Sequence, residues 1–325
     1  MIHEADSHLV EQHYSVITIG RAGVDMYPLE SGKVLSDVGR FGRFLGGSPA
    51  NVAVAAARLG HPTAIISRVG ADDFGDFIMR ELRRLGVATH FVQHVEHAQT
   101  PITFCELFPP DHFPLYFYAP NAPYFEIHRE ELESDAIANT DVFWMTLTGL
   151  AAEPSRSAHQ HAWEIRRRRD HTVLDLDYRE RFWKSPDEAR RTAHEALRHT
   201  SIAIGNRAEC ALVSGWAEPR AAAEWLLEQG VSMAFVKRGP DGVLAMTTEE
   251  CVELPAIPIE VVNGLGAGDA FGGAVCHGLI EGWSLERIVR FANAAGACVA
   301  QVLPCAEAMP TTEDVEALLL RELSA

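Results

Sequence analysis

Residues 172–205, TVLDLDYRERFWKSPDEARRTAHEALRHTSIAIG, contain the pattern that decides the fold class. The apolar run at 172–177 predicts a strand, the stretch at 186–198 predicts a helix, and the run at 201–205 predicts a second strand. A strand, a helix and a strand in this order are typical of a unit in which a helix connects two parallel strands.

The same alternation continues on both sides of this unit. Further strands are predicted at 14–20, 63–69, 91–95, 141–147 and 233–237, and further helices at 48–59, 74–85, 154–169, 268–280, 285–301 and 311–322. A GPDG turn after the strand at 233–237 predicts a hairpin. Together these elements predict an α/β fold, a doubly wound parallel sheet with helices on both faces.

Two stretches interrupt the alternation, at about 24–45 and 100–120. Both are rich in Gly, Pro and aromatic residues and lack a helical period. We expect them to supply extra strands that form a small β lid over the cleft. Residues 14–322 contain no internal repeat or low-complexity linker and are expected to form a single domain, preceded by a flexible N-terminus at 1–13.

Composition excludes several classes of partner. The chain has 325 residues, 47 % of them hydrophobic, with 45 acidic and 28 basic side chains and a net charge of −17. Nucleic acid and anionic membrane surfaces are therefore poor partners, and the basic run at 166–169 is expected on the solvated end of a helix. No apolar run reaches the length of a membrane span, and the start of the chain lacks a signal-peptide core. The six scattered cysteines favour free thiols, so a cytoplasmic location is expected.

The strongest chemical signal is Asn263-Gly264-Leu265-Gly266-Ala267-Gly268-Asp269-Ala270-Phe271, followed by a helical pattern. Small residues before a helix allow its backbone N–H groups to face an anion, and the helix dipole favours negative charge there. Asp269, in the first turn, could take a proton from a hydroxyl that attacks a bound phosphate. Alternatively, this stretch is a Gly-rich turn in which Asp269 is an ordinary N-terminal helix acid.

A second signal is Gly46-Gly47-Ser48-Pro49-Ala50-Asn51, at the start of the first predicted helix. The Gly46-Gly47 pair permits close approach of the backbone to a ligand, and the Asn51 amide can both donate to and accept from sugar hydroxyls. The alternative is plain helix capping, with Ser48 as N-cap and Pro49 at the first helical position.

The two motifs together resemble the signatures of the ribokinase-like (PfkB) family of carbohydrate kinases. Other stretches also resemble this family, in order and at the proper spacing: Val69–Gly75, Asn206–Glu209, Val236–Gly242 and Asn293. The resemblance implies a ribokinase-like fold, with Asp269 as general base and the amides of Gly266, Ala267 and Gly268 around the transferred phosphoryl group. It further implies ATP as phosphate donor and Mg²⁺ near Glu209, bound through water. In the resemblance, the residues expected against ATP are Asn206, Lys237, Gly239, Gly242 and Asn293.

The same resemblance points to a sugar acid as substrate. Asp25 follows the first strand and would bind substrate hydroxyls with Gly46, Gly47 and Asn51, unless it only caps a turn. The stretch Asp175–Trp183 resembles kinases of keto-deoxy sugar acids, in which Arg179 would face the substrate carboxylate with its bidentate guanidinium. Otherwise Arg179 is a surface residue on a loop.

Within the family, the resemblance is closest to kinases that phosphorylate the terminal hydroxyl of 5-dehydro-2-deoxygluconate in myo-inositol catabolism. A kinase of 2-dehydro-3-deoxygluconate or another sugar, a nucleoside kinase, and a non-catalytic sugar-binding regulator are the alternatives. An edge of the lid could pair between subunits in a homodimer or higher homo-oligomer, or could be covered within one chain.

One position departs from the family pattern. Relatives carry an Asp where this chain has Asn263, and that Asp helps to bind a monovalent cation. Weak or absent dependence on K⁺ is therefore expected.

Overall fold

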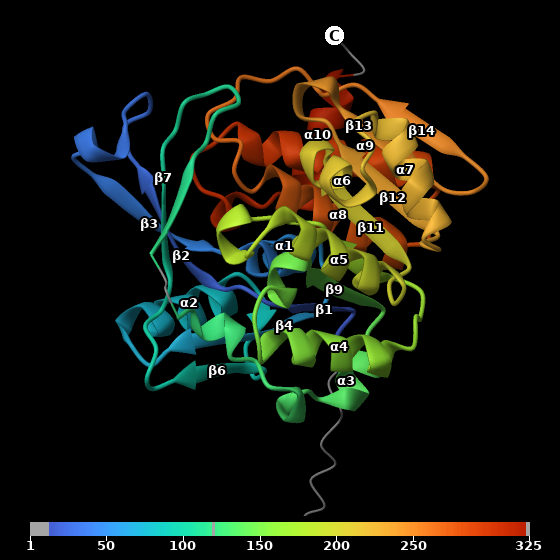
Figure 1. Cartoon of the computed structure of the whole chain (residues 1–325). Coiled ribbons are helices and arrows are strands. Elements are labelled where there is room, and N and C mark those ends of the chain that lie inside the picture. Colours follow the sequence, from blue (N-terminus) through green and yellow to red (C-terminus); the bar gives the residue numbers. More distant parts are fainter. Residues whose placement is uncertain (1–12, 119–120, 323–325) are drawn as a thin grey trace, which may run out of the picture.

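The computed structural model describes residues 13–118 and 121–322, which form an α/β fold with a central sheet between two layers of helices (Figure 1). The sheet has the strand order β14-β13-β12-β11-β10-β9-β1-β4-β5, and β6 also pairs with β4. The strands in this order are β14 (Cys251–Leu254), β13 (Val243–Met246), β12 (Met233–Lys237), β11 (Ile202–Asn206), β10 (Thr172–Asp175), β9 (Val142–Thr146), β1 (Val16–Ile19), β4 (Thr63–Gly70) and β5 (Val87–Ala88), with β6 at Val92–Val95. All pairings from β12 to β5 are parallel, and β13 and β14 add an antiparallel edge. The predicted fold class and hairpin are confirmed.

Helices cover both faces of this sheet. One face packs against α1 (Ser48–Arg58), α2 (Asp73–Arg84), α8 (Ala267–Ile280), α9 (Leu285–Ala300) and α10 (Thr312–Glu322). The other packs against α3 (Ser134–Asn139), α4 (Ser155–Arg166), α5 (Pro186–Leu197), α6 (Arg207–Ser214) and α7 (Pro219–Glu228). Successive side chains of β9 alternate between the two cores, with Trp144 in the first and Phe143 and Met145 in the second. A strand buried on both faces is apolar throughout, which is why such strands could be read from the sequence.

Close packing of α8 brings two helix N-termini together. A Cβ on Gly272 would lie 2.5 Å from the Trp144 ring of β9, and a Cβ on Gly273 would lie 2.3 Å from the Ala55 Cβ of α1. Because these two glycines leave room for β9 and α1, α8 lies directly against both. The N-terminal turns of α1 and α8 therefore meet at one edge of the sheet.

A smaller sheet stands beside this edge (Figure 1). Its order is β3-β2-β7-β8, with β2 at Gly23–Pro28, β3 at Phe41–Gly46, β7 at Ile102–Cys105 and β8 at Leu115–Tyr118. Both stretches that interrupted the sequence alternation contribute strands to it. Residues 119 and 120 of the second stretch, and residues 1–12 of the expected flexible N-terminus, lie outside the described residues.

Three arginines of the basic run at 166–169 are exposed as expected, and the fourth, Arg166, is not. Arg166 is buried, and its Nη1 donates to the carbonyl oxygens of Ile137 and Thr140, so that this guanidinium ties α4 to the chain around α3. The sequence pattern could not reveal this, because the carbonyl acceptors lie 29 and 26 residues away along the chain.

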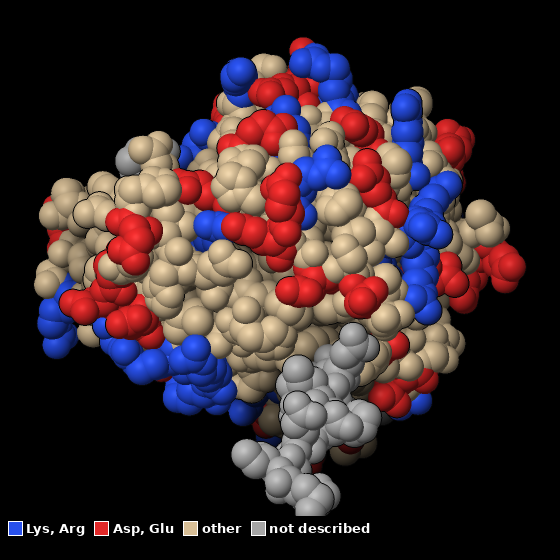
Figure 2. Space-filling view, turned by 90° about the horizontal axis from the view of Figure 1, so that it is seen from below, with Lys and Arg blue, Asp and Glu red and all other residues tan. Residues whose placement is uncertain are grey.

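On the face viewed from below, acidic and basic side chains are interspersed (Figure 2). Within the described residues, no helix combines the length and apolar character needed to span a membrane. All six cysteines are free thiols.

Candidate active site

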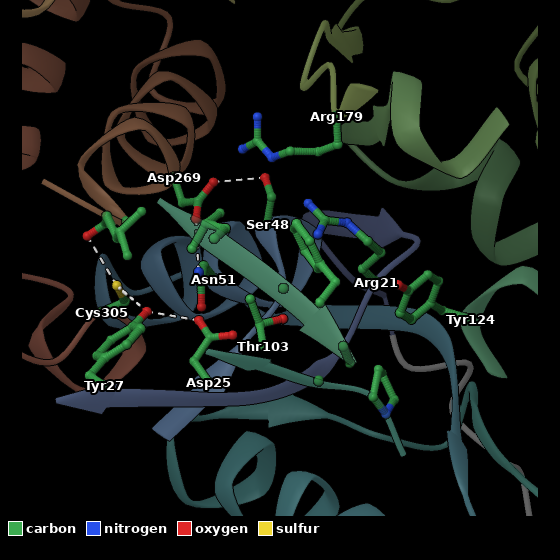
Figure 3. Close-up of a pocket in the computed structure, with 18 residues that line it drawn as sticks. Arg21, Asp25, Tyr27, Ser48, Asn51, Thr103, Tyr124, Arg179, Asp269 and Cys305 are labelled. Carbon is green, nitrogen blue, oxygen red and sulfur yellow. Dashed lines mark hydrogen bonds between the residues drawn. The ribbon is translucent and has the colours of Figure 1, made fainter. Parts of the chain in front are cut away.

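A pocket lies where the N-terminal turns of α1 and α8 face the small sheet (Figure 3). Its lining combines residues from distant parts of the chain, among them Arg21, Asp25, Gly47, Ser48, Asn51, Thr103, Phe117, Tyr124, Arg179, Gly266, Asp269 and Cys305. The predicted residues Asp25, Gly47, Asn51, Arg179, Gly266 and Asp269 are thus brought together in one place.

Asp269 is held by two donors from α1. The Ser48 hydroxyl donates to its Oδ1 at 2.7 Å, and the Asn51 side-chain amide donates to its Oδ2 at 2.8 Å (Figure 3). Burial raises the pKa of Asp269, and the hydrogen bonds from Asn51 and Ser48 counteract part of this rise. A carboxylate fixed in this way is more than an ordinary helix acid, because α1 holds it in one orientation within the pocket.

The start of α1 explains how Ser48 becomes available. Gly47 is the N-cap residue, with a φ of 100°, and no side chain caps the helix. A Cβ on Gly47 would lie 2.5 Å from the Arg21 carbonyl oxygen, so only glycine fits this close approach. The capping alternative for Ser48 is therefore wrong: Ser48 is the first helical residue, and its hydroxyl bonds to Asp269.

The N-terminus of α8 presents backbone donors beside a lysine. Gly266 has a φ of 82° and is the N-cap, and the first helical bonds run from the N–H groups of Asp269 and Ala270 to its carbonyl oxygen. The amides of Ala267 and Gly268 precede these bonds, as the free donors of a helix start do. The Lys237 Nζ lies 3.2 Å from the position that a Cβ on Gly268 would occupy. The free N–H donors, the helix dipole and the Lys237 ammonium together favour binding of an anion at this point.

Two arginines meet at one buried carboxylate on another side of the pocket. Nη2 of Arg21 and Nη2 of Arg179 lie 2.7 Å from Oδ2 and Oδ1 of Asp177, respectively. Burial alone would raise the pKa of Asp177, but the two guanidiniums hold it below its ordinary value. Nη1 of Arg179 also lies 3.5 Å from Oε1 of Glu209. Together with Glu209 these side chains carry no net charge, since two cations face two anions.

Arg21 was missed from the sequence, although it lies in the same Gly-rich stretch as Asp25. Its Nη2 is bonded to Asp177 while its side chain lines the pocket near Tyr124 (Figure 3). Its position directly after a buried strand could have indicated it, because a cationic side chain at a buried position requires an anionic partner.

Asp25 is packed tightly against the backbone of β3. A Cβ on Gly46 would lie 2.2 Å from Oδ1 of Asp25, so Gly46 leaves room for this carboxyl and does not itself line the pocket. The Tyr27 hydroxyl lies 2.8 Å from Oδ2 of Asp25.

We expect Gly46→Ala to displace the Asp25 carboxyl and to destabilise the protein by about 1–3 kcal/mol, the usual range for overpacking. Sugar binding should weaken, while the KM for ATP should change little. Gly39→Ala is the matched control, because a Cβ there meets no atom within 4 Å. Denaturant unfolding and kinetics of the two variants check this, and equal behaviour of the two would contradict it.

The remaining predicted residues lie outside this pocket lining, around the ends of β11 to β14. Asn206 and Glu209 form a capping box at the start of α6, in which each side chain accepts from the other's backbone N–H. Asn206 lies opposite Lys237 in the pairing of β11 with β12. Lys237 thus connects this region to the start of α8.

Farther along this edge, Gly242 and Asn293 lie near the end of β14. A Cβ on Gly242 would lie 2.0 Å from the Leu254 carbonyl oxygen, and the Asn293 amide donates to the Pro255 carbonyl oxygen at 2.8 Å. Gly239 begins the 3-10 turn (Gly239–Asp241) that leads to Gly242. The structure brings Gly242 and Asn293 to the same short segment, 254–255.

Comparison with known proteins agrees with this arrangement. Residues 14–312 match the pfkB family of carbohydrate kinases. The chain is 28 % identical over 320 residues to a 5-dehydro-2-deoxygluconokinase of Clostridium perfringens, covering 96 % of this chain and 94 % of that protein. It is 30 % identical over 316 residues to the enzyme of the same name from Clostridium beijerinckii, covering 94 % and 93 %.

Among solved structures, a putative ribokinase II from E. coli in complex with ATP and Mg²⁺ superposes with a TM-score of 0.86. It is 26 % identical and covers 95 % of this chain and 99 % of its own. Both the length of the family match and the shared fold lead to one conclusion. This chain belongs to the pfkB family of carbohydrate kinases.

Proposed function

We propose that this kinase transfers the γ-phosphoryl group of ATP to the terminal hydroxyl of 5-dehydro-2-deoxygluconate, in myo-inositol catabolism. The observation that carries the proposal is the Asp269 carboxylate, which Ser48 and Asn51 hold beside the anion-favouring start of α8. The names of the relatives supply the sugar acid.

In this mechanism Asp269 accepts the proton of the attacking hydroxyl at a carboxylate oxygen. Ser48 and Asn51 orient the carboxylate, so that little rearrangement is needed when the proton moves. The amides of Gly266, Ala267 and Gly268, with Lys237 beside them, face the phosphoryl oxygens on which negative charge is concentrated. Catalysis therefore rests mainly on positioning and electrostatics.

We assign ATP to the edge formed by Asn206, Lys237, Gly239, Gly242 and Asn293. Mg²⁺, when bound, would neutralise negative charge on the phosphates. Glu209 fits a role through water better than direct ligation, because its carboxylate already accepts from the Asn206 N–H and pairs with Arg179.

The sugar acid is assigned to the pocket under the small sheet, which acts as its lid. Asp25 and Asn51 would bind hydroxyls, with Gly47 giving room for the ligand. Arg179 and Arg21 would face the carboxylate, because both line the pocket and Nε of each is buried without a hydrogen-bond partner in the described residues. Association into a homodimer or higher homo-oligomer and a cytoplasmic location stay predictions.

A panel of acceptors tests the proposal. ADP release would be measured with 5-dehydro-2-deoxygluconate, 2-dehydro-3-deoxygluconate, neutral hexoses, ribose and nucleosides. We expect the highest kcat/KM for 5-dehydro-2-deoxygluconate, with product phosphorylated at the terminal hydroxyl. A preference for 2-dehydro-3-deoxygluconate would support the alternative kinase, and sugar binding without turnover would support a regulator.

We expect this enzyme to depend weakly on K⁺ or not at all. Asn263 is fully buried, its amide donates to the Leu303 carbonyl oxygen at 2.8 Å, and its Oδ1 accepts from the Leu265 N–H at 3.0 Å. Both ends of the side chain are therefore occupied, and an amide lacks the charge of the family's Asp. Rates in Tris, Na⁺ and K⁺ buffers of equal ionic strength should agree, whereas a several-fold activation specific to K⁺ would contradict this expectation.

A further inference from the structure

A chain of three close contacts leads from the sugar side of the pocket to the loop before α8 (Figure 3). Oδ2 of Asp25 lies 2.8 Å from the Tyr27 hydroxyl oxygen. That oxygen lies 2.9 Å from Sγ of Cys305, which lies 3.0 Å from the Leu265 carbonyl oxygen. Tyr27 and Cys305 are each 1 % exposed, so water cannot supply missing partners to them.

Counting hydrogens decides how these contacts are made. If Asp25 is ionised, the chain has only two hydrogens, on Tyr27 and Cys305, for its three contacts. With Tyr27 donating to Asp25 and Cys305 donating to Leu265, the hydroxyl oxygen and the thiol sulfur would face each other at 2.9 Å with no hydrogen between them. A carboxyl hydrogen on Asp25 completes the set: Asp25 donates to Tyr27, Tyr27 donates to Cys305, and Cys305 donates to the Leu265 carbonyl oxygen.

We propose that at mildly acidic pH Asp25 carries this third hydrogen when the sugar site is empty, and that Tyr27 and Cys305 are positioning residues that hold the neutral carboxyl and join it to the loop before α8. The chain then runs in one direction and ends on Leu265, next to the amides assigned to the phosphoryl group.

The charged groups around Asp25 set the pH range in which this hydrogen is held. Burial raises the pKa of Asp25 to about 6, and Asp269 on α8 and Glu307 in the 3-10 turn Ala306–Ala308 act in the same direction. Arg21, after β1, and the hydrogen bond with Tyr27 oppose them.

The other titratable members of the group keep their hydrogens. Burial raises the pKa of Tyr27 and that of Cys305 well above their ordinary values. Cys105 of β7, whose pKa burial also raises, remains a thiol as well. Asp25 is therefore the member of the chain that gains or loses a proton.

The neutral carboxyl suits an anionic substrate, a step that rests on the proposed function. Asp269 already places one negative charge in the pocket, and a second on Asp25 would oppose the entry of a sugar acid. A neutral Asp25 still offers Oδ1 as an acceptor for a substrate hydroxyl. The Cys305 side chain also packs directly against the start of α8, because a Cβ on Gly266 would lie 2.8 Å from its sulfur.

The test uses the protein without substrate, so that it does not depend on which sugar is phosphorylated. The full chain, labelled with carboxyl-¹³C aspartate, is titrated by NMR, and Asp25→Asn identifies the Asp25 signal. We expect Asp25 to titrate well above an ordinary aspartate. In Cys305→Ala the Tyr27 hydroxyl is free to donate to the carboxylate, so the midpoint should fall by about one pH unit. Cys305→Ser keeps a donor and an acceptor and should retain the wild-type midpoint.

Kinetics supply a second readout. If the proposed function holds, the pH profile of kcat/KM for the sugar acid should shift in Cys305→Ala and not in Cys305→Ser, with the KM for ATP unchanged in both. A loss of activity at all pH values without such a shift would mean that Cys305 only supports the fold. That result would overturn the positioning role.

Infrared spectroscopy keeps the proposal testable if Cys305→Ala does not fold. The S–H stretch of Cys305, isolated as the difference between wild type and Cys305→Ser, should move as Asp25 titrates, because the donor in the contact with Tyr27 changes. An S–H band that does not respond, or an Asp25 that titrates in the ordinary range of an aspartate, would overturn the proposal.

Discussion

Asp269→Asn is expected to lower kcat by about 10²–10⁴-fold, the usual contribution of a positioned general base. The substitution removes the proton acceptor and keeps the shape of the side chain. The KM for ATP and the affinity for the sugar should stay close to wild type. Steady-state kinetics and equilibrium binding of the sugar measure these quantities, and a variant that keeps more than about a tenth of the wild-type kcat would contradict the role of Asp269.

The surroundings of Asp269 can accept the amide. Oδ1 of Asn51 is buried and has no hydrogen-bond partner in the described residues. A flip of the Asn51 amide would let this oxygen accept from the new side-chain N–H₂, and the Ser48 hydroxyl can donate or accept. Loss of activity should therefore come without loss of fold. Asp187→Asn, which changes an exposed carboxylate paired with Arg190 at 3.0 Å, is the matched control and should keep full activity.

The pH dependence follows from the same group. Burial raises the pKa of Asp269, and the base is active only when ionised. Turnover should therefore decline as the pH falls, with a midpoint above the ordinary aspartate value of 3.8.

The layered fold was predictable because its main strands are buried on both faces. The strand predicted at 233–237 matches β12 residue for residue, and the helix predicted at 285–301 differs from α9 by one residue. Continuous apolar runs and helical periods are local signals, so no knowledge of the tertiary structure was needed.

Short elements were not predicted, because they lack such local signals. β5 (Val87–Ala88) has two residues, and α3 (Ser134–Asn139) has six. Neither is long enough to show a period, and each depends on its neighbours, β4 in the case of β5. The buried position of Arg166 is likewise set by acceptors that only the folded chain supplies.

In the candidate site, too, local motifs could be read from the sequence and long-range contacts could not. Gly266–Asp269 and Asn51 lie in compact motifs, which is why the sequence indicated them. Their partners could not be read in this way, because Ser48 and Asp269 are 221 residues apart. Arg21 and Asp177 are 156 residues apart, and no spacing rule connects them. The pairing of Arg179 with Asp177 and Glu209 could likewise not be read from the sequence.

The choice of a sugar acid as substrate depends on Arg21 and Arg179 together. If both guanidiniums face the substrate carboxylate, Arg21→Ala and Arg179→Ala should each lower kcat/KM for the sugar acid by roughly 2–5 kcal/mol, since each truncation leaves buried negative charge poorly paired. Arg179→Lys should recover only part of the loss, because an ammonium lacks the bidentate fork. Arg84→Ala, which removes an exposed arginine that pairs with Glu81 on α2, is the matched control.

Neutral sugars distinguish a role of the two arginines in binding the substrate carboxylate from a role in supporting the fold. Any neutral sugar that the wild type accepts should be phosphorylated as well by both alanine variants, because it has no carboxylate to lose. If both arginines bind the same carboxylate, the double variant should lose less free energy of transition-state binding than the sum of the losses of the two single variants. Equal impairment toward acid and neutral sugars would instead mean that Arg21 and Arg179 serve to hold Asp177. In that case the arginine pair would no longer support a sugar acid, and the proposed substrate would rest on the relatives alone.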